Sequence, residues 1–230
     1  MVENDRFKFE DEGYDFPFYN KIPYIPKWGW IVLFLTLVIG ILLTISDEIY
    51  ITILGCIVLI VPVLYFLKWD YKAILRMPSP KEFGLAVALF AGYLIYGIAM
   101  GVLLEQVGIV SPGLIEEGSV TVMSTFSSIF SIMGEEFLKF IPLMFFLRVA
   151  YKFSNNRKLS VVISVALVMI MFAAMHAYTP VMFVYALFIQ GFGSIFEFFG
   201  YIKTKNIMIP YISHLLTDVF IFIFFLLGMA

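Results

Sequence analysis

Residues 28–46 read WGWIVLFLTLVIGILLTIS and residues 49–67 read IYITILGCIVLIVPVLYFL, with only Asp47 and Glu48 between them. Crossing the hydrocarbon core of a bilayer, roughly 30 Å, takes about 20 apolar helical residues. Each run is close to that length and contains no charged side chain. This stretch therefore predicts two membrane-spanning helices joined by a short polar turn.

Five more apolar runs follow, separated by prolines and short polar clusters that are typical stops. The seven runs are 28–46, 49–67, 83–104, 119–147, 159–178, 181–202 and 206–229. Residues 1–27 form an aromatic and acidic N-terminal segment, which we expect in the cytoplasm or at the membrane interface. The pattern predicts an all-α fold, a polytopic helical bundle of about seven transmembrane helices over residues 28–230.

The composition agrees with a membrane environment. Hydrophobic residues make up 62% of the chain and charged residues 14%, whereas a soluble domain carries about 25% charged residues. No basic block indicates nucleic acid as a partner, and the single cysteine, Cys56, excludes an intrachain disulfide. Because residues 1–27 lack an apolar core with a small-residue cleavage site, run 28–46 is interpreted as a retained helix.

Lysine and arginine residues predict the orientation. They gather in the N-terminal segment and in segments 68–82, 148–158 and 203–205, and they are absent from the alternate connections and the C-terminal end. Positive charge favours the cytoplasmic side of a membrane. We therefore expect a multi-pass protein of the cell membrane with a cytoplasmic N-terminus and an external C-terminus. Of the 15 basic residues, Lys139 alone lies inside an apolar run.

Seven ionisable residues other than Tyr and Cys lie inside the runs, and they include both histidines of the chain. Each charge at the centre of a bilayer costs at least about 2.5–3.5 kcal/mol, so such residues face a protein interior and need partners. At i,i+4 spacing, Glu135 can pair with Lys139, and Asp218 could hold the ring of His214. The seven are Glu135, Glu136, Lys139, His176, Glu197, His214 and Asp218.

These residue types suit the hydrolysis of an amide bond. A glutamate beside a neutral histidine can deprotonate a water molecule, and a second histidine can donate a hydrogen bond to the developing oxyanion. Neither Ser nor Cys is then required. Two histidines and two glutamates could also bind zinc, although no His-Glu-x-x-His pattern is present. A buried ion-pair network that only holds helices together is the other interpretation, and Glu197 could either support a site or reach toward the inner membrane face.

Three segments resemble known motifs. GEEFLK at 134–139, FAAMH at 172–176 and HLLTD at 214–218 resemble, in this order, the motifs of the CAAX protease and bacteriocin-processing family of intramembrane proteases. That family includes the type II CAAX prenyl endopeptidases, and the PrsW-type proteases are relatives. The resemblance covers about residues 119–220 and implies a protease-like core there. The first three runs and the N-terminal segment carry none of it.

The resemblance implies a role for each motif residue. Glu135 is the general base that activates water, and His176 helps to position that water. His214 helps to form the oxyanion hole, with Asp218 in the last motif position beside it. Glu136 supports the site structurally. The family also favours catalysis by glutamate without a metal cofactor, with zinc as the alternative.

The sequence departs from the CAAX-type pattern at two places. The position four residues after Glu136 is Phe140, where the family has Arg; instead Lys139 lies three residues after Glu136, as in PrsW-type proteins. Asp218 is also PrsW-like, whereas the CAAX type often has Asn. Because Lys139 could neutralise Glu135 and leave it a poorer base, both glutamates stay open as candidates for the base, with Glu135 favoured.

The depth of the two histidines sets a geometric requirement. At 1.5 Å per residue, His176 would lie about 26 Å from the inner end of its helix and His214 only about 12 Å. They can meet if the turn at 178–180 lies within the membrane beside a water cavity, which is allowed for buried turns. We expect that arrangement.

Three functions remain as candidates. The first is an intramembrane endopeptidase acting on a membrane-associated peptide: a prenylated CAAX tail, a peptide precursor or a transmembrane regulator. The second is a catalytically silent membrane scaffold or immunity protein of the same family. The third is a proton-coupled transporter, because buried chains of Glu, His and Lys also relay protons; the short chain and lack of an internal repeat argue against it.

Overall fold

The computed structural model describes residues 5–46, 48–109 and 122–227. Within these ranges the regular elements are all helical, which confirms the predicted all-α class. The long helices are α1 (Lys27–Thr44), α2 (Ile49–Phe66), α3 (Pro80–Gln106), α4 (Val122–Ser154), α5 (Arg157–Met175) and α8 (Met208–Leu226). Between α5 and α8 lie α6 (Pro180–Ala186), a π-helical turn (Leu187–Gly191) and α7 (Ile195–Thr204).

With α6, the π-helical turn and α7 counted as one broken helix, the described residues contain seven long helical segments, as predicted. Five segments are long and apolar enough to cross a membrane: α1, α2, α3, α5 and the broken helix Pro180–Thr204. Helix α4 is continuous but contains the charged residues Glu135, Glu136 and Lys139, and α8 has a shorter apolar stretch, Met208–Phe224. The predicted connection with Pro112, Glu116 and Glu117 lies outside the described residues.

Helix α4 departs from its predicted boundary. The apolar run ends near residue 147, yet the helix continues through Arg148 and Lys152 to Ser154. Hydropathy shows where lipid contact ends, whereas helix formation tolerates Arg and Lys well. The helix stops at Asn155, which has a left-handed backbone conformation (φ 50°), and Asn156 then caps α5 by accepting a hydrogen bond from the Leu159 amide.

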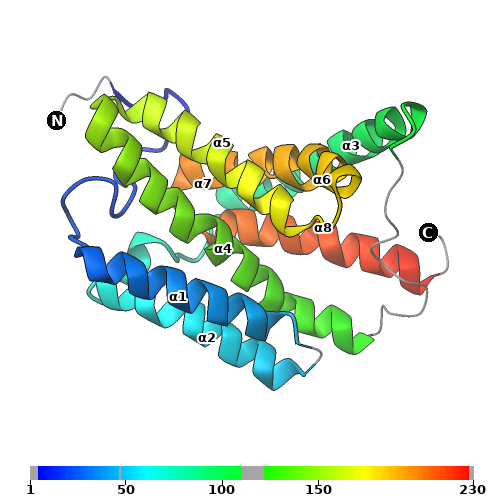
Figure 1. Ribbon diagram of the computed structural model, residues 1–230, viewed down its shortest axis with the longest axis horizontal. Helices are drawn as coiled ribbons and strands as arrows, with labels where there is room; N and C mark the ends of the chain where they lie inside the picture. Colours follow the sequence, from blue (N-terminus) through cyan, green and yellow to red (C-terminus); the bar gives the residue numbers. More distant parts are fainter. Residues whose placement is uncertain (1–4, 47, 110–121, 228–230) are drawn as a thin grey trace.

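The helices pack as two groups around α4 (Figure 1). Helices α1 and α2 pair closely and both lie against α4, while α3 packs on α8 and α7. A Cβ on Gly55 would lie 2.8 Å from the Gly40 carbonyl oxygen, so glycine allows α1 and α2 to approach each other. Helix α5 runs along α4 on its other side. As a result α4 is the central helix, and its polar residues Ser128, Glu136 and Lys139 are buried in the interior.

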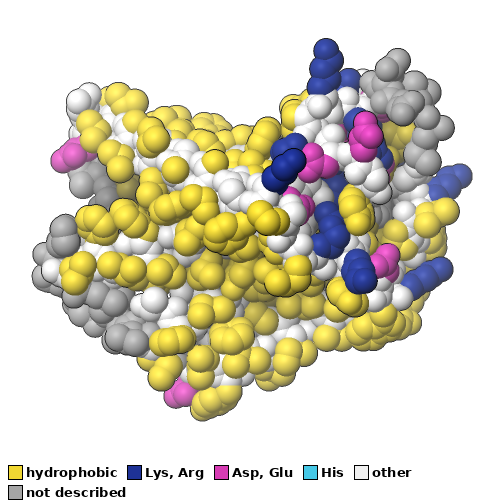
Figure 2. Space-filling view, turned by 180° about the vertical axis from the view of Figure 1, so that it is seen from behind, with side chains coloured by type: hydrophobic (Ala, Val, Ile, Leu, Met, Phe, Trp, Pro, Cys, Tyr) yellow, Lys and Arg dark blue, Asp and Glu magenta, His cyan; other side chains and the backbone are white. Residues whose placement is uncertain are grey.

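The N-terminal segment folds onto one end of this bundle. Phe16, Phe18 and Tyr19 are buried, and Glu10 binds both Arg157, at the start of α5, and Lys205, after α7. Figure 2 shows most charged side chains of the visible face gathered at one end, and mainly hydrophobic side chains over the rest of the coloured surface. Although burial raises the pKa of Glu10, hydrogen bonds from Arg157 and Lys205 outweigh it and lower that pKa to about 2.

Candidate active site

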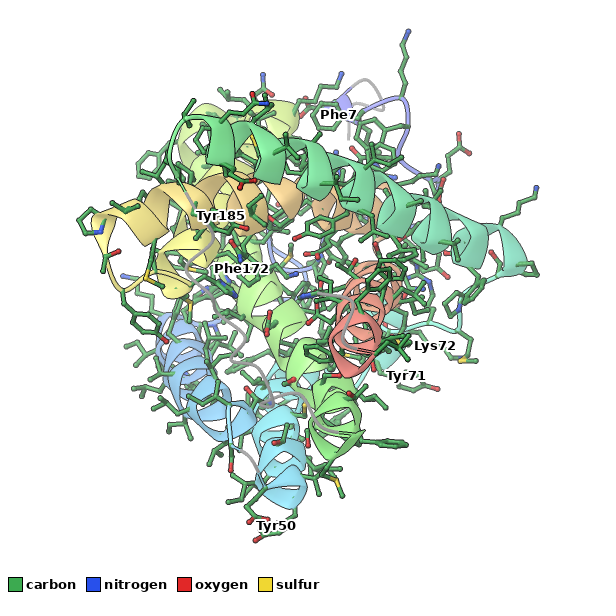
Figure 3. The ribbon with its side chains drawn as sticks, turned by 90° about the vertical axis from the view of Figure 1, so that its right-hand side faces the viewer. Phe7, Tyr50, Tyr71, Lys72, Phe172 and Tyr185 are labelled. Carbon is green, nitrogen blue, oxygen red and sulfur yellow. The ribbon has the colours of Figure 1, made fainter. Side chains whose placement is uncertain are left out.

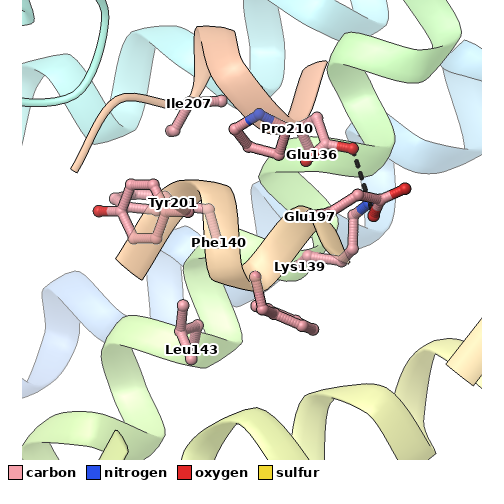
Figure 4. Close-up of a pocket in the computed structure, with 9 residues that line it drawn as sticks. Glu136, Lys139, Phe140, Leu143, Glu197, Tyr201, Ile207 and Pro210 are labelled. Carbon is pink, nitrogen blue, oxygen red and sulfur yellow. Dashed lines mark hydrogen bonds and ion pairs between the residues drawn. The ribbon is translucent and has the colours of Figure 1, made fainter. Parts of the chain in front are cut away.

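Lys139 is the cation at the centre of the buried site. Its Nζ lies 2.6 Å from Glu136 Oε1 and forms a second ion pair with Glu197 of α7, as seen in Figure 4. Lys139 therefore pairs with Glu136 and Glu197 instead of Glu135, the partner that the i,i+4 spacing allowed. Both i,i+3 and i,i+4 neighbours are within reach on a helix, and Lys139 points to the side where α7 supplies a second carboxylate.

The ring of His214, on α8, lies between the two glutamates of α4. Its Nδ1 is 2.9 Å from Glu136 Oε1. An ionised carboxylate only accepts hydrogen bonds, so Nδ1 carries the proton and donates to Glu136. Nε2 faces Glu135 Oε2 at 3.8 Å and Asp218 Oδ1 at 3.7 Å. Asp218 was the possible holder of this ring; Glu136 makes the hydrogen bond instead, and Asp218 makes only the longer contact with the other ring nitrogen.

The adjacent glutamates differ in exposure. The side chain of Glu135 is 31% exposed and that of Glu136 is 4% exposed. Neighbouring positions on a helix point about 100° apart, so the Glu136 carboxylate is enclosed between Lys139 and His214 while that of Glu135 lies on the more open side. Asp218, with its side chain 30% exposed, lies on that open side too.

His176 closes α5 and lies near the same cluster. Its Nδ1 is 2.8 Å from the Phe172 carbonyl oxygen, which makes Nδ1 the donor and leaves Nε2 as an acceptor in the neutral ring. The rings of Phe172 and His176 contact edge to face at 4.6 Å, and Lys139 Nζ lies 4.9 Å from the Phe172 ring centroid. In Figure 3, Phe172 lies in the interior beside α4. His176 therefore shares a buried neighbour with Lys139.

Glu197 belongs to this cluster although it lies outside the three motifs. It is buried and bound to Lys139, and its Oε1 lies 3.7 Å from His214 Nδ1. The interpretation of Glu197 as a side chain that reaches toward the membrane face is therefore wrong. The other interpretation, that Glu197 supports the site, fits these contacts; the sequence signal for it was a lone acid within a Phe-rich apolar run.

A small cavity of about 20 Å³ adjoins the cluster between α4, α7 and α8 (Figure 4). Glu136, Lys139 and Glu197 line one part, and Tyr201 and Leu143 line another. That volume accommodates about one water molecule. The Tyr201 hydroxyl is buried and has no hydrogen-bond partner among the described residues.

The only group of metal-ligand type found in the described part of the chain is Glu136, Glu197 and His214. One donor atom from each lies within 4.8 Å of the others. Carboxylate and imidazole are suitable zinc ligands. However, Lys139 Nζ lies among these donors, 2.6 Å from Glu136 Oε1 and 3.5 Å from His214 Nδ1. A metal ion would have to displace this ammonium.

One family model matches the part of the chain that contains these side chains. Residues 117–220 match a family described as type II CAAX prenyl endopeptidase Rce1-like. No curated protein and no solved structure matches the chain. The matched residues contain α4, α5, α7 and most of α8, and thus every side chain described in this site. The chain is therefore a multi-pass helical membrane protein, and its residues 117–220 are similar to the Rce1-like CAAX protease family.

Proposed function

We propose that this protein is an intramembrane endopeptidase that cleaves a prenylated, membrane-associated peptide with Glu135 as general base. The proposal rests on the different surroundings of the two glutamates, Glu135 and Glu136. Glu136 is enclosed by Lys139 and His214, and an ion-paired carboxylate is a poor base. Glu135 is partly exposed and faces the Nε2 side of the His214 ring.

Glu135 then performs the proton transfers. Its carboxylate takes a proton from water, and the resulting hydroxide attacks the carbonyl carbon of the scissile peptide bond. When the tetrahedral intermediate collapses, the C–N bond breaks and protonated Glu135 returns the proton to the leaving nitrogen. His176 supports the first step, because its Nε2 is left as an acceptor and can orient the same water.

His214 stabilises the oxyanion in this scheme. Since Nδ1–H is held by Glu136, only Nε2 can point to substrate, and it donates a hydrogen bond only as an imidazolium. Four carboxylates, including that of Asp218, lie within 4 Å of the ring, whereas Lys139 is the one cation of the cluster among the described residues. The negative charges therefore outnumber the positive charge and would compensate a positive charge on His214. Asp218 acts through this ring rather than as a donor.

Metal independence is part of the proposal, since the Lys139 ammonium takes the place between Glu136, Glu197 and His214 that a metal would need. We expect strong chelation to leave peptide cleavage largely unchanged. Loss of activity that zinc restores would instead assign Glu136, Glu197 and His214 as ligands.

The proposed orientation follows the alternation of basic residues, with the N-terminus in the cytoplasm and the C-terminus outside. Reporter fusions at Met1 and Ala230 should lie on opposite sides of the membrane. Both reporters on one side would mean an even number of spans and would contradict the seven-helix topology.

The activity test uses purified protein in nanodiscs. A farnesylated peptide ending in a CAAX sequence should yield two peptide products by mass spectrometry, and the same peptide without the farnesyl group should be cleaved more slowly. Equal cleavage of both peptides would favour a peptide precursor or a transmembrane regulator as substrate. No cleavage of any of the three substrate classes would favour the silent scaffold.

A further inference from the structure

Glu197 approaches the catalytic helices from a third element. It lies on α7, whereas Glu136 and Lys139 lie on α4 and His214 lies on α8. Helix α7 follows the π-helical turn Leu187–Gly191, and such turns change the direction in which later side chains point. Glu197 points into the interior, where Lys139 binds it.

One oxygen of Glu136 is shared between two donors. Glu136 Oε1 lies 2.6 Å from Lys139 Nζ and 2.9 Å from His214 Nδ1. Without a second acceptor, the ammonium would move fully toward Glu136 and compete with the ring for that oxygen. Glu197 supplies the second acceptor on the other side of Lys139, so the hydrogen bond from His214 to Glu136 keeps its geometry.

Stability alone does not account for a buried Glu197. Burying a carboxylate is costly, and a buried ion pair often gives no more stability than apolar side chains of similar size. The Glu197 side chain is 10% exposed and that of Lys139 is 3% exposed, so both charges bear that cost. A buried charge network of this kind does fix one arrangement of the groups it joins.

We propose that Glu197 is a positioning residue of the active site: through Lys139 it fixes Glu136, and through Glu136 it orients His214 so that Nε2 faces Glu135. The kinetic part of this inference rests on the proposed peptidase function. The orientation of the His214 ring does not, and it can be measured separately.

The decisive variant is Glu197→Gln, which removes the charge and keeps the shape. Because the chain has two histidines, 15N NMR of histidine-labelled protein gives few ring signals, and a His176→Gln sample assigns them. We expect the His214 Nδ1 signal to shift and the His176 signals to stay. Glu105→Gln, an exposed change on α3, is the matched control and should move neither.

Kinetics supply the second readout. A misplacement of catalytic groups by about 1 Å can cost about 100-fold in rate, so Glu197→Gln should lower kcat by about 10- to 100-fold with little change in KM. Glu197→Asp keeps the charge on a shorter side chain and should recover part of kcat. If Glu197→Gln does not fold, the Glu197→Asp protein is used for NMR and must still show a displaced His214 signal.

The outcomes separate the two proposals. If the wild-type protein cleaves no peptide but the His214 signal moves in Glu197→Gln, the positioning inference holds and the peptidase proposal fails. If the His214 signals match wild type in the folded variant, the inference is overturned, whatever happens to the melting temperature.

Discussion

Two buried charge clusters in this protein contain similar residues but differ in whether their polar groups are all engaged by partners within the cluster. The end cluster consists of Glu10, Asp15, Arg157 and Lys205, and the core cluster of Glu136, Lys139, Glu197 and His214. In the end cluster the guanidinium of Arg157 donates two hydrogen bonds of 2.6 and 2.5 Å to Glu10, and Lys205 donates a third of 2.6 Å. In the core cluster one ring nitrogen of His214 is held, and the other faces carboxylates that are partly exposed.

This difference distinguishes a cluster that holds the N-terminal segment in place from the cluster that we propose as the active site. Bidentate Arg–carboxylate pairing satisfies both Glu10 oxygens and fixes the N-terminal segment against the ends of α5 and α7. In the core cluster Glu136 instead accepts a hydrogen bond from His214, and we propose that the buried charges hold this ring in one orientation. The presence of buried ions is therefore a weak indicator of catalysis; an oriented group that faces accessible acids is a better one.

The largest effect should come from removing the central cation of the core cluster. Lys139→Met leaves Glu136 and Glu197 buried together without their cation, and breaking a buried ion pair in this way costs about 3–5 kcal/mol. We expect a strongly lowered unfolding midpoint in detergent together with loss of peptide cleavage. A wild-type midpoint would show that the two carboxylates do not depend on Lys139.

The corresponding change in the end cluster should affect stability alone. Glu10→Gln leaves Arg157 and Lys205 without their shared carboxylate and should cost about 3 kcal/mol, while the cleavage rate per folded molecule stays near wild type. Glu12→Gln, exposed in the same segment, is the control. A cleavage rate per folded molecule well below that of wild type would instead couple the end cluster to the proposed active site.

The end cluster also predicts that folding stability decreases at acidic pH. The pKa of Glu10 is lowered from 4.5 to about 2, so its contribution is fully present above pH 4.5 and is lost as the pH falls toward 2. Unfolding midpoints of wild type and Glu10→Gln, measured across this range, should therefore converge at low pH. A constant difference at every pH would contradict the assignment.

The smallest effect should come from an exposed pair beside the end cluster. Lys203 and Asp11 lie 2.6 Å apart, with side chains 32% and 46% exposed. Exposed ion pairs contribute about 0–1 kcal/mol, so Asp11→Asn should change the unfolding midpoint little. A loss comparable to that of Glu10→Gln would mean that Asp11 fixes the segment too.

Hydropathy and motif order predicted most of the fold and the part of the chain that matches the family. The run 28–46, for example, corresponds to α1 at Lys27–Thr44. The partners of Lys139 could not be predicted, because spacing on one helix admits both Glu135 and Glu136, and the choice depends on Glu197 from a different helix. The burial of Glu10 could not be predicted either. An acidic residue in the N-terminal segment gives no sign of burial in the sequence, because tertiary packing is what brings Arg157 to it.

The most direct test of the central claim is to compare cleavage of the farnesylated CAAX peptide by Glu135→Gln and Glu136→Gln proteins. Glu135→Gln should lower the rate by about 10²–10⁴-fold, the usual value of a general base, and should leave the unfolding midpoint unchanged. Glu136→Gln should lower the rate less and should destabilise the fold. An inactive Glu136→Gln protein beside an active Glu135→Gln protein would reverse the roles, and wild-type cleavage by both would contradict the glutamate mechanism.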